Sequence, residues 1–190
     1  MSIKDLIITT PNPRLRGRSK KVVVLSDEIR RVIDDMKAAT LDWESSRPHE
    51  VGVALAAIQI DQPQRVIVIR NDFDNKGDKT FAVFINPEIV KYEGTVEEDY
   101  EGCLSVKDIY GKVPRYSKIR MKATDEQGRQ VRVRAEGFLA RVIQHELDHL
   151  SGKLFIDLIA DKPEAFYKLL PDDKLINMSQ DEVKKTGIFR

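Results

Sequence analysis

Cysteine and histidine are scarce in this chain of 190 residues. It contains one cysteine, Cys103, and three histidines, His49, His145 and His149. A lone cysteine cannot form a disulfide within the chain, so Cys103 is a buried small hydrophobe, a reactive thiol or a metal ligand. The residues around it must decide among these three roles.

The chain also lacks an excess of charge and a long apolar run. Lysine plus arginine number 32 and aspartate plus glutamate 31, which gives a net charge of +1. This balance provides no excess positive field for a nucleic-acid backbone or an anionic membrane, so we expect no DNA partner. The sequence has neither a signal-like start nor a run of about 18 apolar residues, and we therefore expect a cytoplasmic protein without a membrane anchor.

Length and periodicity predict one compact domain over residues 1–190. Apolar residues at helical spacing predict a surface helix over 26–43, with Ser26 as its N-cap. Runs of β-branched and aromatic residues predict strands at 65–70, 81–86 and 89–92. Alternation at period two predicts a hairpin of 118–124 and 129–135 with one solvent-exposed face.

The segment 138–150 differs from these elements, because its apolar residues cover most of a helix circumference. Gly152 stands where a left-handed cap would end such a helix. A helix that is apolar on nearly every side should be buried against sheets. The predicted fold class is α+β, with mixed or antiparallel strands wrapped around one central helix.

The central helix carries the segment His145-Glu146-Leu147-Asp148-His149. Histidines four residues apart project from one face of a helix, at a separation that suits a single tetrahedral metal. Glu146 is rotated by roughly 100° about the axis, so its carboxylate can reach a water on the metal and act as general base and acid. The alternative is a chance match of the kind common on charged, exposed helices. This helix is apolar on nearly every side, so a chance match would leave two histidines and a glutamate buried without a purpose.

A catalytic metal site of this kind needs a third protein ligand and one open position. The long zinc-protease pattern is excluded, because its last histidine position holds Phe155. Glu164 follows a proline without a periodic helix to aim it, and His49 lies in a polar loop, where a surface imidazole is the ordinary interpretation. Cys103 is the favoured ligand, because Gly102 gives the backbone freedom to turn a thiolate inward. Thiolate plus two imidazoles suits zinc or ferrous iron.

A small-residue run, Gly52-Val53-Ala54-Leu55-Ala56-Ala57-Ile58-Gln59, ends in a single amide. Such runs usually reflect tight packing. Beside a hydrolytic metal, however, Gln59 becomes a candidate donor for the oxyanion formed at an attacked carbonyl.

Together these segments resemble a known family. The runs 52–59, 101–105 (Glu-Gly-Cys-Leu-Ser) and 144–149 (Gln-His-Glu-Leu-Asp-His) are similar to the three signature motifs of peptide deformylases, in the same order. The resemblance extends to 11–16, 84–87 and 113–115, and so covers about residues 3–160. For residues 161–190, a C-terminal extension, the sequence predicts no structure.

The resemblance implies metal-dependent removal of the formyl group from N-formylmethionyl nascent chains, with transient contact to the ribosome and a monomeric enzyme. It implies Glu146 as general base and acid, with Gln59 and the backbone N–H of Leu104 binding the oxyanion. The implied metal, iron(II) natively and zinc or nickel in preparations, is held by Cys103, His145 and His149.

The implied substrate contacts come from two segments. The strand-like residues Gly52, Val53 and Ala54 would pair with the peptide, and the methionine pocket would be formed by Val53, Phe138 and Val142. Glu101 and Arg115 would form a structural ion pair behind the site.

One departure from the family pattern is Ala54, where glycine is usual. If that position needs a positive φ or a very close substrate backbone, the methyl group costs about 1 to 2 kcal/mol. The alternative interpretation is therefore a deformylase-like metal-binding protein with altered or lost substrate binding.

Overall fold

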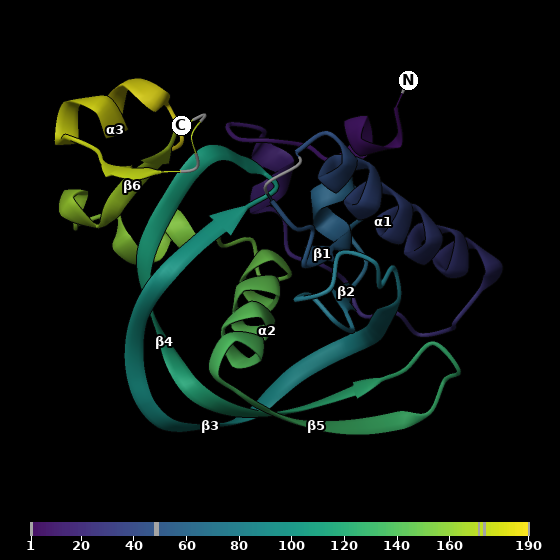
Figure 1. Ribbon diagram of the computed structural model, residues 1–190. Helices are drawn as coiled ribbons and strands as arrows, with labels where there is room; N and C mark the ends of the chain where they lie inside the picture. Colours follow the sequence, from purple (N-terminus) through teal and green to yellow (C-terminus); the bar gives the residue numbers. More distant parts are fainter. Residues whose placement is uncertain (1, 48–49, 171, 173, 190) are drawn as a thin grey trace.

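The computed structural model describes residues 2–47, 50–170, 172 and 174–189. His49, predicted to be a surface residue, lies outside them. In the described part, helix α2 (Gly137–His149) lies inside the curve of two long strands, β3 (Phe81–Cys103) and β4 (Val106–Thr124) (Figure 1). The predicted α+β fold, with strands wrapped around one central helix, is confirmed.

The named strands form one sheet in which every pairing is antiparallel. Its order is β1-β2-β3-β4-β6-β7, and β5 pairs with the C-terminal part of β4, residues 118–124. The remaining strands are β1 (Ala54–Ala56), β2 (Val66–Arg70), β5 (Gln130–Glu136), β6 (Phe166–Leu169) and β7 (Leu175–Asn177). Strand β1 is at one end of this order, so no strand of the described residues pairs with its second edge.

The strands predicted at 81–86 and 89–92 are parts of the single strand β3. The predicted break at Asn86 is instead a bulge, with Asn86 at φ 52° and a register shift between Ile85 and Glu88. Strand β3 then continues to Cys103 through residues that are mostly exposed. A strand exposed on both faces shows no alternation of apolar and polar residues, so the predicted strand ended too early.

Helix α1 (Asp27–Ser45) is the predicted surface helix. Its N-cap is Ser26, whose hydroxyl accepts a hydrogen bond from the Ile29 amide at 3.4 Å. Its buried face packs on β1 and β2, and this core includes Ile29, Val32, Ile33 and Met36. Burial of this apolar stripe stabilises the helix more than its propensity does.

The described residues form two further hydrophobic cores. One packs α2 against β4 and β5, as the period-two alternation of the hairpin predicts, with Ile119 and Met121 fully buried. The other joins β4 to the short helix η4 (Phe155–Ile159) and to the C-terminal segment. Gly152 has φ 76°, as predicted, and a Cβ there would lie 2.4 Å from the Arg16 carbonyl oxygen, so no larger residue fits.

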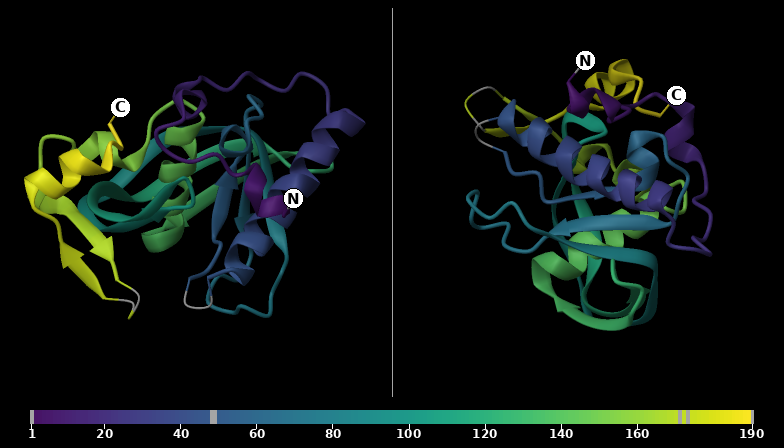
Figure 2. Two further views of the ribbon diagram at one scale, coloured as in Figure 1. Left: turned by 90° about the horizontal axis from the view of Figure 1, so that it is seen from above. Right: turned by 90° about the vertical axis from the view of Figure 1, so that its right-hand side faces the viewer.

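The C-terminal segment, for which the sequence predicted no structure, extends the sheet. Strand β6 pairs with β4, where Tyr167 opposes Tyr110, and is followed by β7 and helix α3 (Gln180–Thr186). These elements lie on the side of the molecule away from α1 (Figure 2). The other short helices are η1 (Ile3–Leu6), η2 (Pro13–Arg16), η3 (Ala57–Ile60) and η5 (Pro163–Ala165). Within the described ranges, no helix has the length and apolarity that a bilayer span requires.

Candidate active site

Helix α2 brings its two histidines together on one face. His145 and His149 are one turn apart, and their Nε2 atoms are separated by 3.2 Å. Both side chains are buried, at 8% and 1% exposure. Burial, together with the nearby His145, keeps the pKa of His149 well below its usual value, so this imidazole is neutral and its ring nitrogen can bind a metal.

Cys103 reaches the same point from the sheet. It is the last residue of β3, before the two-residue turn of Leu104 and Ser105, and its Sγ lies 3.2 Å from Nε2 of His149. The ligand atoms of Cys103, His145 and His149 all lie within 4.8 Å of one another. Three atoms spaced in this way fit around one tetrahedral ion with bonds of about 2.0 to 2.3 Å. The predicted set of donors therefore forms a possible metal site.

The reason predicted for Gly102 is wrong. Its backbone is not among the positive-φ glycines, so it does not provide unusual backbone freedom. A Cβ at Gly102 would instead lie 2.6 Å from Cε1 of Tyr110. Glycine is needed there because the Tyr110 ring packs directly on the backbone next to Cys103.

Glu101 orients the first histidine. Its Oε2 lies 2.9 Å from Nδ1 of His145, which points the other ring nitrogen at the ligand set. The predicted ion pair with Arg115 is confirmed and is bidentate, at 2.9 and 3.0 Å. Burial alone would raise the pKa of Glu101, but hydrogen bonds from His145 and Arg115 lower it to about 2. The carboxylate therefore stays charged at neutral pH.

Arg141 belongs to this network and was not predicted. Its Nη1 donates to Glu101 at 2.9 Å and to the Val113 carbonyl at 2.7 Å, and its Nη2 donates to the Glu97 carbonyl at 2.8 Å. It thereby ties α2 to β3 and β4 behind His145. The available signal was an arginine one turn before His145 in a helix that the pattern predicted to be buried.

Glu146 is next to the ligand set and is 4% exposed. Its Oε2 is buried without a hydrogen-bond partner among the described residues, and this oxygen can accept a proton from a water. Burial raises the pKa of Glu146 to about 7. A carboxylate with this pKa can both take and return a proton near neutral pH.

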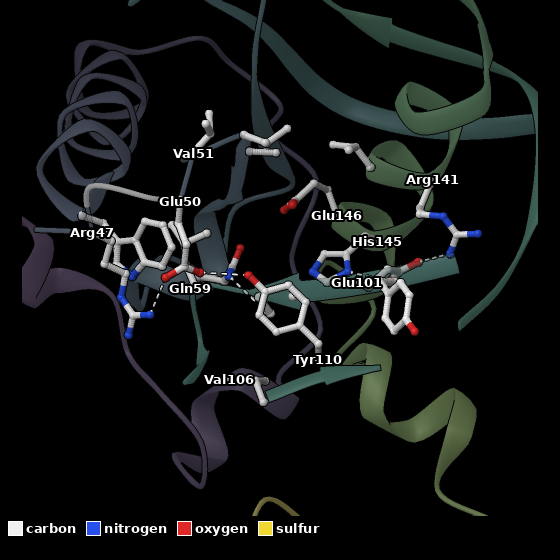
Figure 3. Close-up of a pocket in the computed structure, with 18 of the residues that line it drawn as sticks. Arg47, Glu50, Val51, Gln59, Glu101, Val106, Tyr110, Arg141, His145 and Glu146 are labelled. Carbon is white, nitrogen blue, oxygen red and sulfur yellow. Dashed lines mark hydrogen bonds and ion pairs between the residues drawn. The ribbon is translucent and has the colours of Figure 1, made fainter. Parts of the chain in front are cut away.

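Gln59 lies opposite, in helix η3. Its Oε1 accepts from the Ala56 amide at 2.8 Å, which turns its Nε2 toward Ser105 Oγ at 3.0 Å and Cys103 Sγ at 3.6 Å. The amide nitrogen therefore points toward the Cys103 thiol and the turn that follows it. Figure 3 shows Gln59 across the cleft from His145 and Glu146. Ser105, fully buried, helps to orient this amide and was not predicted as a functional residue.

Several of these groups, among them Gln59, Cys103 and Glu146, line a cleft of about 350 Å³. The predicted substrate residues Val53, Ala54, Phe138 and Val142 all line it, and Phe138 is 47% exposed at its mouth. Gly52 does not line the cleft. Its amide donates to Glu44 at 2.9 Å, and a Cβ there would lie 2.7 Å from Thr40 Cγ2, so this glycine permits close packing on α1.

Ala54 is regular strand backbone. It pairs with Ile69 in β1–β2 and is not among the residues with positive φ. The backbone part of the predicted penalty therefore does not apply, because an alanine adopts this conformation without strain.

Comparison with known proteins agrees with the motifs. The model of the polypeptide deformylase family matches residues 4–164. The chain belongs to the peptide deformylase family. It is 41% identical over 171 residues to the peptide deformylase of Thermomicrobium roseum, covering 88% of this chain and 92% of that one. With the peptide deformylase of Agrobacterium fabrum it shares 43% identity over 161 residues, covering 84% and 89%.

The fold agrees with solved deformylase structures. The crystal structure of a peptide deformylase from Legionella pneumophila superposes with a TM-score of 0.72 at 36% identity, covering 95% of this chain and 93% of that one. These relatives do not favour the alternative of a deformylase-like metal-binding protein with altered or lost substrate binding. Among the described residues, Glu164 is not part of the metal-ligating group, which contains Cys103 instead.

Proposed function

We propose that this member of the family hydrolyses the N-formyl group of N-formylmethionyl peptides and releases formate. The observation that carries the proposal is the convergence of Cys103, His145 and His149 beside Glu146, which lines the cleft. The three ligands would hold one divalent metal, with iron(II) proposed as the native ion and zinc or nickel as substitutes. When bound, the metal would polarise the formyl carbonyl and acidify the attacking water.

Two sets of groups would transfer the proton and stabilise the developing charge. Glu146 would take a proton from water at Oε2 as the water oxygen bonds to the formyl carbon, and would return it to the nitrogen as the C–N bond breaks. The products are formate and a peptide with a free amino group. Gln59 Nε2 and the backbone N–H of Leu104 would donate to the oxygen on which negative charge develops.

The peptide would bind along the open edge of β1. In the part of the chain that the structure describes, β1 pairs with β2 on one side only, so Val53 and Ala54 can add a peptide strand on the other. The methionine side chain would then enter the apolar end of the cleft, against Phe138 and Val142. We place this activity in one catalytic domain over residues 1–190, a cytoplasmic monomer acting on nascent chains at the ribosome.

The test is hydrolysis of formyl-Met-Ala-Ser by protein purified without oxygen, together with metal analysis. Glu146→Ala should keep its metal and lose about 10²- to 10⁴-fold in kcat, because the proton acceptor is gone.

Cys103→Ser should lose most of its metal, because the thiolate supplies the negative charge of the set.

Glu164→Ala is the matched control for the ligand assignment, since Glu164 is exposed and was the competing candidate. This variant should keep both metal and turnover. Wild-type protein that holds one metal per chain but releases no formate would contradict the proposal.

A further inference from the structure

Part of the cleft is lined by polar side chains that none of the proposed roles uses. Arg47 and Glu50 come from the segment between α1 and β1, and Asp108 and Tyr110 come from β4. All four line the cleft. We refer to Arg47, Glu50, Asp108 and Tyr110 as the cross-cleft bridge.

Two separate contacts join the two segments. Tyr110 donates its hydroxyl to Oε2 of Glu50 at 2.9 Å, and Arg47 Nη1 lies 2.9 Å from Oδ1 of Asp108. Arg47 also pairs with Glu50 at 2.6 Å and lies over the Trp43 ring, 5.0 Å from its centroid. Figure 3 shows Tyr110 pointing across the cleft toward Glu50. The four charged and polar groups are therefore mutually satisfied and hold each other in place.

The Tyr110 side of the bridge is fixed to the β3–β4 hairpin, which contains the proposed metal ligand Cys103. The Tyr110 ring packs on Gly102, next to Cys103, and its backbone pairs with Tyr167 of β6. The Glu50 side leads within three residues to Val53, on the edge proposed to take the peptide. The bridge thus connects the backbone beside a proposed metal ligand to the proposed peptide-binding edge.

We propose that Tyr110, through its hydrogen bond to Glu50, is a positioning residue for the peptide: it holds residues 50–54 at a fixed place relative to Cys103. This inference rests on the proposed function. A peptide extended beyond methionine uses that edge, whereas the bond that breaks lies at the metal set. The bridge therefore governs binding of the extended peptide and not the cleavage step.

Tyr110→Phe tests this assignment, because it removes one hydroxyl and keeps the ring on Gly102. The KM for formyl-Met-Ala-Ser should rise about threefold to tenfold, the range for one net hydrogen bond, while kcat changes less than about twofold. The KM for formyl-methionine amide, which lacks the following residues, should stay unchanged. Tyr116→Phe is the control, since it makes the same change on β4 outside this cleft.

A double-mutant cycle with Glu50→Gln isolates the bond itself. If Tyr110 and Glu50 act through each other, the two KM effects should not add. Equal losses for both substrates, or an unchanged KM for the tripeptide, would overturn the assignment.

A second measurement does not depend on turnover. Amide hydrogen exchange over residues 50–56 should be faster in Tyr110→Phe than in Tyr116→Phe, because the bridge no longer holds that segment. Unchanged exchange would reject the bridge, whereas absence of formate release from wild type would reject only the proposed function.

Discussion

Two of the clusters in which carboxylates meet arginines border the cleft, and they differ in burial. Behind the metal set, the Glu101 carboxylate is 4% exposed and contacts His145, Arg115 and Arg141. In the cross-cleft bridge, the Glu50 side chain is 19% exposed and that of Asp108 40%. Loss of one partner in a desolvated cluster leaves an uncompensated buried charge, whereas water can replace a partner at the rim. Similar residue types should therefore support stability in the first cluster and tune substrate binding in the second.

The largest effect should follow from Glu101→Ala. This change leaves Arg115 and Arg141 buried without their shared carboxylate, so the free energy of unfolding should fall by about 3 to 5 kcal/mol. Urea unfolding of the metal-free protein measures it. Glu93→Ala is the matched control, because Glu93 lies on the same strand and pairs with exposed Arg120, a pair worth less than about 1 kcal/mol. Equal losses in the two variants would show that burial does not separate them.

The residues of the buried cluster also show what the sequence can predict. The spacing of His145 and His149, with Glu146 between them, predicted the chemistry because helical geometry alone places these groups. Arg141 was missed, since its partners are the carboxylate and backbone carbonyls of strands 28 to 44 residues away. Contacts between distant segments leave no periodic signal in one sequence.

The same limit on sequence-based prediction applies to the sheet and to the cross-cleft bridge. Strands with one buried face, such as 118–124, were predicted because their residues alternate. The exposed part of β3 was not, because neither of its faces forces a pattern. The cross-cleft bridge joins Arg47 and Glu50 to Asp108 and Tyr110, which are distant in the sequence. Gly102 was noticed for the wrong reason, since its packing partner Tyr110 is visible only in three dimensions.

A smaller effect should appear in the pH dependence of the metal-free protein. Burial raises the pKa of Glu146 from 4.5 to about 7 in the folded state, so the folded chain keeps this proton to higher pH than the unfolded chain. The stability from protonated Glu146 is complete below about pH 4.5 and is lost as the pH rises through about 7.

Comparison with Glu146→Gln separates this group from the rest. Between pH 5 and 8, wild type should lose at most about 3 kcal/mol relative to the variant, since each pKa unit corresponds to about 1.4 kcal/mol. The other buried groups titrate in both chains and largely cancel in this difference. Parallel stability curves in urea, with EDTA present, would contradict a raised pKa.

The smallest effect on stability should come from the cross-cleft bridge. Asp108→Asn removes the ion pair with Arg47, but this pair is part-exposed, so the free energy of unfolding should fall by less than about 1 kcal/mol. Asp108 has φ 56°, a conformation that asparagine tolerates as well as aspartate.

Asp108→Ala separates the charge from the backbone at this position. Alanine tolerates the left-handed conformation less well, so this variant should be less stable than Asp108→Asn by about 1 kcal/mol or more. Thermal and urea unfolding of the two variants measures the difference. If Asp108→Asn lowers the free energy of unfolding by several kcal/mol, the Arg47–Asp108 pair is as important for stability as the Glu101 cluster. The difference in burial would then not separate the two clusters.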